Sequence, residues 1–194
     1  MLNEILLLAA AYLLGSIPTG LLLAKAAGVD IRTTGSGNIG ATNVYRTLGR
    51  SVGIATLAGD CLKGFLPIIA AKYLGMADLW IALAGLAAFL GHVYSIFLAF
   101  KGGKGVATAL GVFLGISPLA VLISLGIFIA VVVASRYISL GSIIAAAAMP
   151  PLVAFLDGRP QLVAVTVVIA SIVIFKHRDN IARLRAGTEN RFKA

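Results

Sequence analysis

Charged side chains are scarce in this chain of 194 residues: Asp, Glu, Lys and Arg together make up only 12% of it, whereas hydrophobic residues make up 60%. Soluble domains carry about 25% charged residues. The shortage excludes an ordinary soluble protein and predicts an all-α, polytopic membrane helix bundle. The length allows one such bundle and no separate soluble part, so we expect a single integral-membrane domain over residues 1–194.

Cysteine and acidic residues are scarce as well. Cys61 is the only cysteine, which excludes a disulfide within the chain. Only 7 Asp and Glu stand against 16 Lys and Arg, which gives a net charge of +9. The chain has no nucleic-acid-binding pattern, and its basic residues flank apolar segments. We therefore expect anionic lipid headgroups and anionic substrates as partners, and no nucleic acid.

Several catalytic and binding motifs are also missing. Neither histidine is followed by an aspartate five positions later, so the His-x4-Asp motif of the common glycerolipid acyltransferases is absent. The chain has no G-x-S-x-G nucleophile elbow, no cluster of metal ligands and no dinucleotide fingerprint. We accordingly expect neither a metal nor a cofactor.

Apolar segments predict about seven transmembrane helices. The stretch 105–135 is too long for one straight crossing of about 20 residues and contains Ser117 and Pro118, so it predicts two short helices. A single kinked or re-entrant element is the alternative. The expected helices cover residues 5–24, 52–73, 78–99, 105–116, 119–135, 138–156 and 161–175.

The positions of the basic residues predict the orientation of these helices. Glu4 precedes the first span and Lys25 follows it, which places the N-terminus outside. With seven crossings, 14 of the 16 Lys and Arg residues lie on the inner side when Lys63, within the second span, is counted with them, and only Lys72 and Arg159 lie outside. The C-terminus is then cytoplasmic. Three polar segments also face the cytoplasm, namely residues 26–50, 100–105 and 176–194.

A glycine-rich segment between two apolar ones, residues 100–108, is the first candidate for a phosphate site. Its backbone can turn sharply and direct several N–H groups into one concavity. Lys104 adds positive charge, and the helix expected after the segment directs the positive end of its dipole to the same place. A glycine-rich turn with lysines reaching for the membrane surface is the alternative. The glycines concerned are Gly102, Gly103 and Gly105.

The polar loop at residues 26–50 is the second candidate. It is dense in small hydrogen-bonding side chains and includes Arg46, whose guanidinium suits bidentate contact with phosphate. Capping of a helix next to a flexible loop is the alternative, because Ser, Thr and Asn are ordinary capping residues. The neighbouring side chains that could bind phosphate are Ser36, Asn38, Thr42 and Asn43.

The interiors of expected membrane spans contain Asp60, Lys63 and His92, and His177 lies near the start of the polar tail. Asp60 and Lys63 lie three apart on one helix face and can pair. Charges at membrane depth are costly and often functional, but here we favour a supporting role that orients the loops. His92 is expected to be a hydrogen-bonded packing residue. His177 opens the tail, where its imidazole can donate, accept or carry charge; a basic tail that binds anionic lipid is the alternative.

Three motifs occur together and in order: SGNIGATNVYR at residues 36–46, FKGGKGVAT at 100–108 with Gly91 and His92 before it, and HRDNIARLRAGTEN at 177–190. The ordered set closely resembles the bacterial acyl-phosphate:glycerol-3-phosphate acyltransferases, the PlsY family, over the whole chain. The resemblance implies transfer of a fatty acyl group from acyl phosphate to the 1-hydroxyl of glycerol 3-phosphate. The products would be lysophosphatidic acid and phosphate, in the first acylation of phospholipid biosynthesis. It also implies the bacterial cytoplasmic (inner) membrane, an active site on its cytoplasmic face and, as a partner, the soluble enzyme that makes acyl phosphate.

The resemblance also assigns roles to residues. Ser36 and Arg46 are expected to contact substrate phosphate, while Lys104 and the backbone of residues 102–105 cradle the phosphate of glycerol 3-phosphate. His177 and Asn180 are expected to complete the catalytic site, and Glu189 to hold the tail loop through hydrogen bonds. Acyl phosphate is an activated mixed anhydride, so we expect substrate-assisted catalysis without an obligatory protein base. A membrane transporter or channel for organic phosphates is the alternative.

Overall fold

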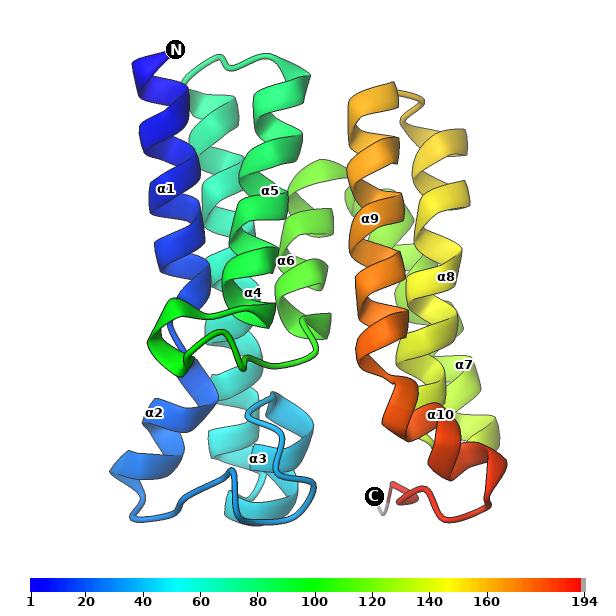
Figure 1. The fold of residues 1–194 in the computed structure, drawn as a ribbon. Coiled ribbons are helices and arrows are strands. Elements are labelled where there is room, and N and C mark those ends of the chain that lie inside the picture. The colour runs from blue at the N-terminus through cyan, green and yellow to red at the C-terminus, as the bar shows by residue number, and fades with distance from the viewer. Residues whose placement is uncertain (193–194) are drawn as a thin grey trace. The chain divides into compact units, whose positions relative to one another are not determined.

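The structure is a computed structural model that describes residues 1–192. Its regular elements are all helices, and the described residues form no β-strand. The chain divides into two compact units, Met1–Gly115 and Ile116–Ala194, each of which is described by itself (Figure 1). The all-α fold predicted from composition is confirmed.

In the first unit, α1, α4 and α5 pack against one another, and the short α2 and α3 pack on α4. The N-terminus and the α4–α5 connection lie at one end of this unit, whereas α2, α3 and their connecting loop lie at the other (Figure 1). The elements are α1 (Leu2–Ser16), α2 (Thr19–Ala26), α3 (Ala41–Leu48), α4 (Arg50–Tyr73), α5 (Asp78–Val93), the 3-10 turn η1 (Ile96–Leu98) and α6 (Val106–Ile116).

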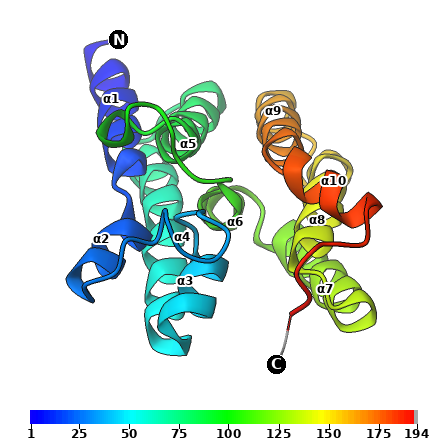
Figure 2. The same cartoon turned by 60° about the horizontal axis from the view of Figure 1, so that its bottom comes forward.

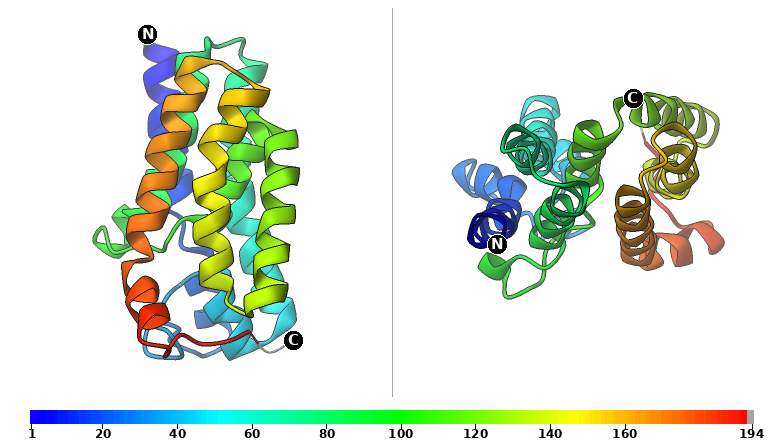
Figure 3. Two further views of the ribbon diagram at one scale, coloured as in Figure 1. Left: turned by 90° about the vertical axis from the view of Figure 1, so that its right-hand side faces the viewer. Right: turned by 90° about the horizontal axis from the view of Figure 1, so that it is seen from above.

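In the second unit, α8 packs against both α7 and α9, and a short α10 continues α9 (Figure 3). α10 is bent by 52° from α9. The elements are α7 (Pro118–Ser135), α8 (Ile138–Leu156), α9 (Pro160–Lys176) and α10 (Arg178–Arg185).

Helices occupy all seven apolar segments expected from the sequence. Five spans are long and apolar enough to cross a membrane, and the bent pair α9 and α10 is a sixth candidate. The stretch 105–135 forms two helices, because Ser117 interrupts the first and Pro118 begins the second, at a position where a helix tolerates proline. Only one of the two is short: α6 has 11 residues and α7 has 18.

The first apolar segment, expected as one span, is broken between α1 and α2. Pro18 has no N–H to continue the helical hydrogen bonds, and proline disfavours helical backbone in the residue before it. Ile17 accordingly has extended backbone, with φ −60° and ψ 117°. The two pieces together still form one candidate span of 25 residues, Leu2–Ala26.

The third segment ends earlier than expected, at Val93 instead of residue 99, and η1 follows. The hydroxyl of Ser95 donates a hydrogen bond to the carbonyl of Ser16 at 2.6 Å. This bond fixes the chain beyond α5 to the broken end of α1. It also gives the carbonyl of Ser16 a donor at a point where the helical hydrogen bonds are interrupted.

α3 lies within a stretch expected to be a polar loop. Val44 and Leu48 are four positions apart, so they lie on the same face of the helix, and both pack inward. Gly49, with φ 86°, ends the helix in a conformation that favours glycine. A helix of eight residues with an apolar pair and a terminal glycine therefore positions Arg46.

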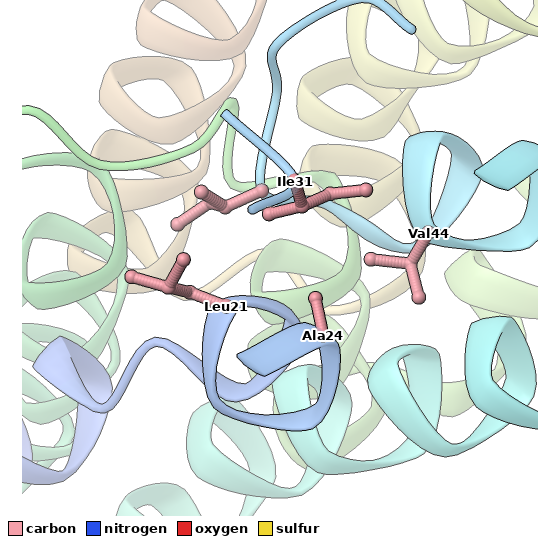
Figure 4. Packing of buried hydrophobic residues seen from close by; sticks show 5 residues of the cluster. Leu21, Ala24, Ile31 and Val44 are labelled. Carbon is pink, nitrogen blue, oxygen red and sulfur yellow. The ribbon is translucent and has the colours of Figure 1, made fainter. Parts of the chain in front are cut away.

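A small apolar cluster holds the polar loop in place (Figure 4). Leu21 and Ala24 from α2 and Val44 from α3 enclose Ile31 and Ile39 of the loop between them. All five side chains are buried, and Leu48, Val52 and Leu98 pack around them. The loop with the expected phosphate-binding residues is thus fixed on its own core.

Candidate functional site

Asn43 organises the loop before α3. It is 2% exposed, its side-chain nitrogen faces the carbonyls of Ile31, Thr34 and Asn38 at 2.9–3.2 Å, and its side-chain oxygen accepts the N–H of Ser36 at 2.9 Å. These bonds occupy the amide within the loop. The structure therefore shows Asn43 bracing the loop, and its contact with phosphate stays a prediction.

The remaining candidates of this loop are more accessible. Ser36 and Arg46 are exposed, while Asn38 and Thr42 are half-buried. The side-chain oxygen of Asn38 accepts the N–H of Gly40 at 2.8 Å, which fixes the turn that leads into α3. Ser36 and Arg46 are therefore the most exposed of the expected phosphate-binding residues in this stretch.

The glycine-rich loop is fastened to the end of α5. The N–H of Gly102 donates to the carbonyl of Val93 at 3.1 Å, and the N–H of Gly103 donates to the carbonyl of His92 at 3.2 Å. Two of the N–H groups expected to face phosphate thus hold the loop. Phosphate binding here, which stays a prediction, depends on half-buried Lys104 and on the following turn into α6.

The segment between α5 and α6 lies beside the break between α1 and α2 (Figure 1), and α2, α3 and their connecting loop come forward in Figure 2. Leu98, from the segment between α5 and α6, packs against the apolar cluster under the other loop. Arg46 and Lys104 are the two basic residues among the expected phosphate-binding residues of the first unit. Basic side chains suit ligands with negative charge.

A cluster of ionisable side chains is buried inside the first unit. Asp60, Lys63 and His92 are each at most 4% exposed. Lys63 Nζ pairs with Asp60 Oδ1 at 2.8 Å and donates to the carbonyl of Ile17 at 2.7 Å, at the break between α1 and α2. His92 Nδ1 lies 3.7 Å from the same Asp60 oxygen. The predicted Asp60–Lys63 pair is confirmed, and it supports the broken helix.

In the second unit, His177 lies at the bend between α9 and α10. It is 3% exposed, and its Nδ1 lies 2.7 Å from the carbonyl of Val173. A carbonyl only accepts hydrogen bonds, so Nδ1 carries the hydrogen. In the neutral ring, Nε2 is then an acceptor.

Glu189 accepts hydrogen bonds from three donors on two helices of the second unit, α8 and α10. Oε1 accepts from Asn180 at 2.7 Å and from Ser139 at 2.8 Å, and Oε2 accepts from Arg183 at 2.7 Å. Burial alone would raise the pKa of this carboxyl, but the three donors outweigh it and hold the pKa below its ordinary value. The hydrogen bonds expected of Glu189 are present, and they fix Asn180.

Sequence reasoning missed several partners in these groups. Ser139 lies 50 positions before Glu189, and Ile17 lies 46 positions before Lys63, so no local pattern joins either pair. Arg183 lies within the quoted tail motif, yet its ion pair with Glu189 was not anticipated. No group of three His, Cys, Asp or Glu that could hold a metal occurs in the part of the chain that the structure describes.

These features define an all-helical integral membrane protein whose basic and small polar side chains gather where the helices end. The chain belongs to the glycerol-3-phosphate acyltransferase family, whose model matches residues 5–187. It is 87% identical to a glycerol-3-phosphate acyltransferase of Geobacter metallireducens and 74% identical to one of Geobacter sulfurreducens, over 194 residues and the full length of both chains in each case. Membership of this enzyme family decides against the transporter alternative.

Solved structures agree with this assignment. PlsY (YgiH), an integral membrane glycerol 3-phosphate acyltransferase, matches in its glycerol 3-phosphate form with a TM-score of 0.94 and 43% identity. The match covers 98% of this chain and 96% of that one. The lysophosphatidic acid form of PlsY matches with a TM-score of 0.92 and the same identity and coverage. The resemblance drawn from the three motifs is confirmed at the level of the family.

Proposed function

We propose that the chain transfers a fatty acyl group from acyl phosphate to the 1-hydroxyl of glycerol 3-phosphate. The hydroxyl oxygen bonds to the acyl carbonyl carbon, and the bond from that carbon to the phosphate oxygen breaks. The hydroxyl proton passes to phosphate, so the products are lysophosphatidic acid and inorganic phosphate. The observation that carries the proposal is the ordered set of three motifs in a chain of this enzyme family that lacks the His-x4-Asp motif.

Both substrates carry phosphate, which gives a reason for more than one basic residue in the motifs. In our proposal, Arg46 and Ser36 contact a substrate phosphate, because a guanidinium and a hydroxyl can both donate to the oxygens of a phosphate. Lys104 holds the phosphate of glycerol 3-phosphate as a point charge. Charge-assisted bonds of this kind contribute about 1.5–3 kcal/mol each, so the loss of one is measurable.

His177 and Asn180 also act on the substrate in this proposal. With Nδ1–H donated to Val173, the neutral His177 ring offers Nε2 as an acceptor to a substrate hydroxyl. The charged ring would instead donate from Nε2 to phosphate. Neither role requires His177 to remove a proton, because a phosphate monoester has a second pKa of about 6 and can itself accept one near neutral pH. We therefore favour substrate-assisted catalysis.

The setting of the reaction belongs to the same proposal. The chain would work as one domain in the bacterial cytoplasmic (inner) membrane, with the site on the cytoplasmic face, where the soluble enzyme that makes acyl phosphate can deliver its product. The distribution of Lys and Arg supports this orientation.

Release of inorganic phosphate by the purified protein in lipid vesicles tests the reaction. We expect release only when acyl phosphate and glycerol 3-phosphate are both present, together with equimolar lysophosphatidic acid. Lys104→Met, which removes the ammonium proposed to hold glycerol 3-phosphate, should lower the release sharply and serves as the low-activity control. Equal turnover with an acyl thioester donor, or phosphate release without glycerol 3-phosphate, would contradict the proposal. Uptake of glycerol 3-phosphate into the vesicles without acylation would favour a transporter.

A further inference from the structure

The glycine-rich loop rests on the side chain of His92. If Gly103 carried a Cβ atom, the three atoms nearest to it would all belong to the His92 ring, with Nε2 the first. The N–H of Gly103 also donates to the His92 carbonyl. His92 therefore supports Gly103 with both its backbone and its ring. Lys104 is the next residue, so the position of Gly103 determines where the Lys104 side chain begins.

The side chain of His92 in turn contacts the buried pair of Asp60 and Lys63. Its Nδ1 lies 3.7 Å from Asp60 Oδ1, and Asp60 pairs with Lys63. Lys63 donates to the carbonyl of Ile17, at the break between α1 and α2. A continuous series of buried polar contacts thus leads from the broken first span to the glycine-rich loop. None of its side chains is more than 4% exposed.

We propose that His92 is a positioning residue, which sets the backbone of Gly103 and thereby the place of the Lys104 ammonium. This role rests on the proposed function, in which Lys104 holds the phosphate of glycerol 3-phosphate. The buried Asp60–Lys63 pair fixes the ring of His92, and the ring fixes the loop. Tight packing transmits such a placement because a closely packed interior deforms little.

A Cβ atom added at Gly102 and one added at Gly103 would meet different atoms, which makes the proposal testable. A Cβ at Gly103 would meet the ring of His92, whereas a Cβ at Gly102 would meet backbone atoms of His92 and Val93. A smaller side chain at position 92 can make room for the first Cβ. The same change at position 92 does not move the backbone atoms that a Cβ at Gly102 would meet.

The experiment is a double-mutant cycle between positions 92 and 103. Gly103→Ala alone should raise KM for glycerol 3-phosphate more than it lowers kcat, with a loss of up to about 10²-fold in kcat/KM for a displacement near 1 Å. His92→Asn keeps an N–H donor near Asp60 and removes the part of the ring that faces Gly103. Added to Gly103→Ala, it should recover at least about tenfold in kcat/KM. Gly102→Ala is the matched control, and His92→Asn should not rescue it.

Absence of recovery in the Gly103→Ala pair would overturn the proposal, as would equal recovery in the Gly102→Ala pair. His92→Ala serves as a second partner if the Asn variant does not fold. Thermal stabilisation by glycerol 3-phosphate, which follows ligand affinity, gives a readout without acyl donor. If the wild-type protein failed to use acyl phosphate, the proposed function would fall. The pattern of stabilisation by glycerol 3-phosphate would still decide the role of His92.

Discussion

Arg46 lies exposed near the end of α3, a helix held by apolar contacts on its opposite side. Arg46→Lys keeps the charge but replaces a planar, bidentate donor with a point charge. We expect kcat/KM to fall by about 10- to 10²-fold, which corresponds to the loss of about 1.5–3 kcal/mol for a charge-assisted bond. Steady-state kinetics in vesicles measure it. Arg50→Lys, also exposed and four residues further on, is the matched control and should be active. Near-normal turnover of Arg46→Lys would reduce this arginine to a charge that sets orientation.

His177 allows a test of the mechanism itself. His177→Asn or His177→Gln retains an N–H donor but removes a basic nitrogen. We expect substantial kcat with a raised KM, because positioning is lost while the substrate phosphate still accepts the proton. Single-turnover kinetics separate binding from chemistry. A fall of about 10³-fold or more in kcat at unchanged KM would make His177 the general base instead.

Residue types were more predictable than residue roles. The sequence identifies Ser, Asn, Arg and Lys in two loops because those types suit phosphate. It does not reveal that Asn43 uses its amide on backbone carbonyls, since those carbonyls are brought together only by the folded loop. The same holds for Gly102 and Gly103, whose N–H groups are taken by the end of α5.

At the scale of an element, α4 contains the buried Asp60–Lys63 ion pair. Lys63→Met would remove the ammonium that pairs with buried Asp60, and breaking a buried pair in this way costs about 3–5 kcal/mol. We expect a clearly lower Tm in detergent, followed by intrinsic fluorescence. Lys25→Met, at an exposed position on α2, should leave Tm nearly unchanged. Combining Lys63→Met with Asp60→Asn should restore part of the loss. An unchanged Tm for Lys63→Met alone would mean that the pair does not stabilise the helix.

α10 and the tail after it depend on the ionised form of Glu189. The pKa of this carboxyl is depressed in the folded protein, so the stabilisation is present above the unfolded pKa and is lost as the pH falls through the folded value. We therefore expect the amide protons of α10 to exchange slowly at neutral pH and to lose protection on acidification below about pH 4, just under the ordinary glutamate pKa. Hydrogen exchange across a pH series measures this.

Glu189→Gln should abolish most of that pH dependence and lower protection at neutral pH, since the ion pair with Arg183 is lost. Asp179→Asn, at an exposed site on the same helix, is the matched control. Equal pH profiles for the wild-type protein and Glu189→Gln would show that another group governs the tail.

Element boundaries were predictable wherever membrane thickness sets them. The apolar lengths located every long helix, because a crossing needs about 20 apolar residues. Breaks and short helices were harder to predict. Pro18 carried the signal for the break after α1, and the pair Val44 and Leu48 before Gly49 carried the signal for α3, but eight mostly polar residues resemble a loop.

At the scale of the whole molecule, orientation in the membrane is the main prediction. In a Cys61→Ser background, cysteines introduced at Thr33 and Thr188 should react with a membrane-impermeant thiol reagent only from the cytoplasmic side. Ala77→Cys, in the connection between α4 and α5, should react only from the outside. All three positions are exposed. Labelling of positions 33 and 188 solely from the outside would reverse the predicted orientation.

The Asp60–Lys63 pair also bears on how the nascent chain enters the bilayer. Both charges belong to one helix and lie three residues apart, so this part of α4 can reach the hydrocarbon with its two charges already paired. If the two partners belonged to different helices, each helix would enter the membrane with an unpaired charge until the second helix was inserted. Lys63 can then find the Ile17 carbonyl of the earlier span after insertion. His92, which arrives on α5, joins last.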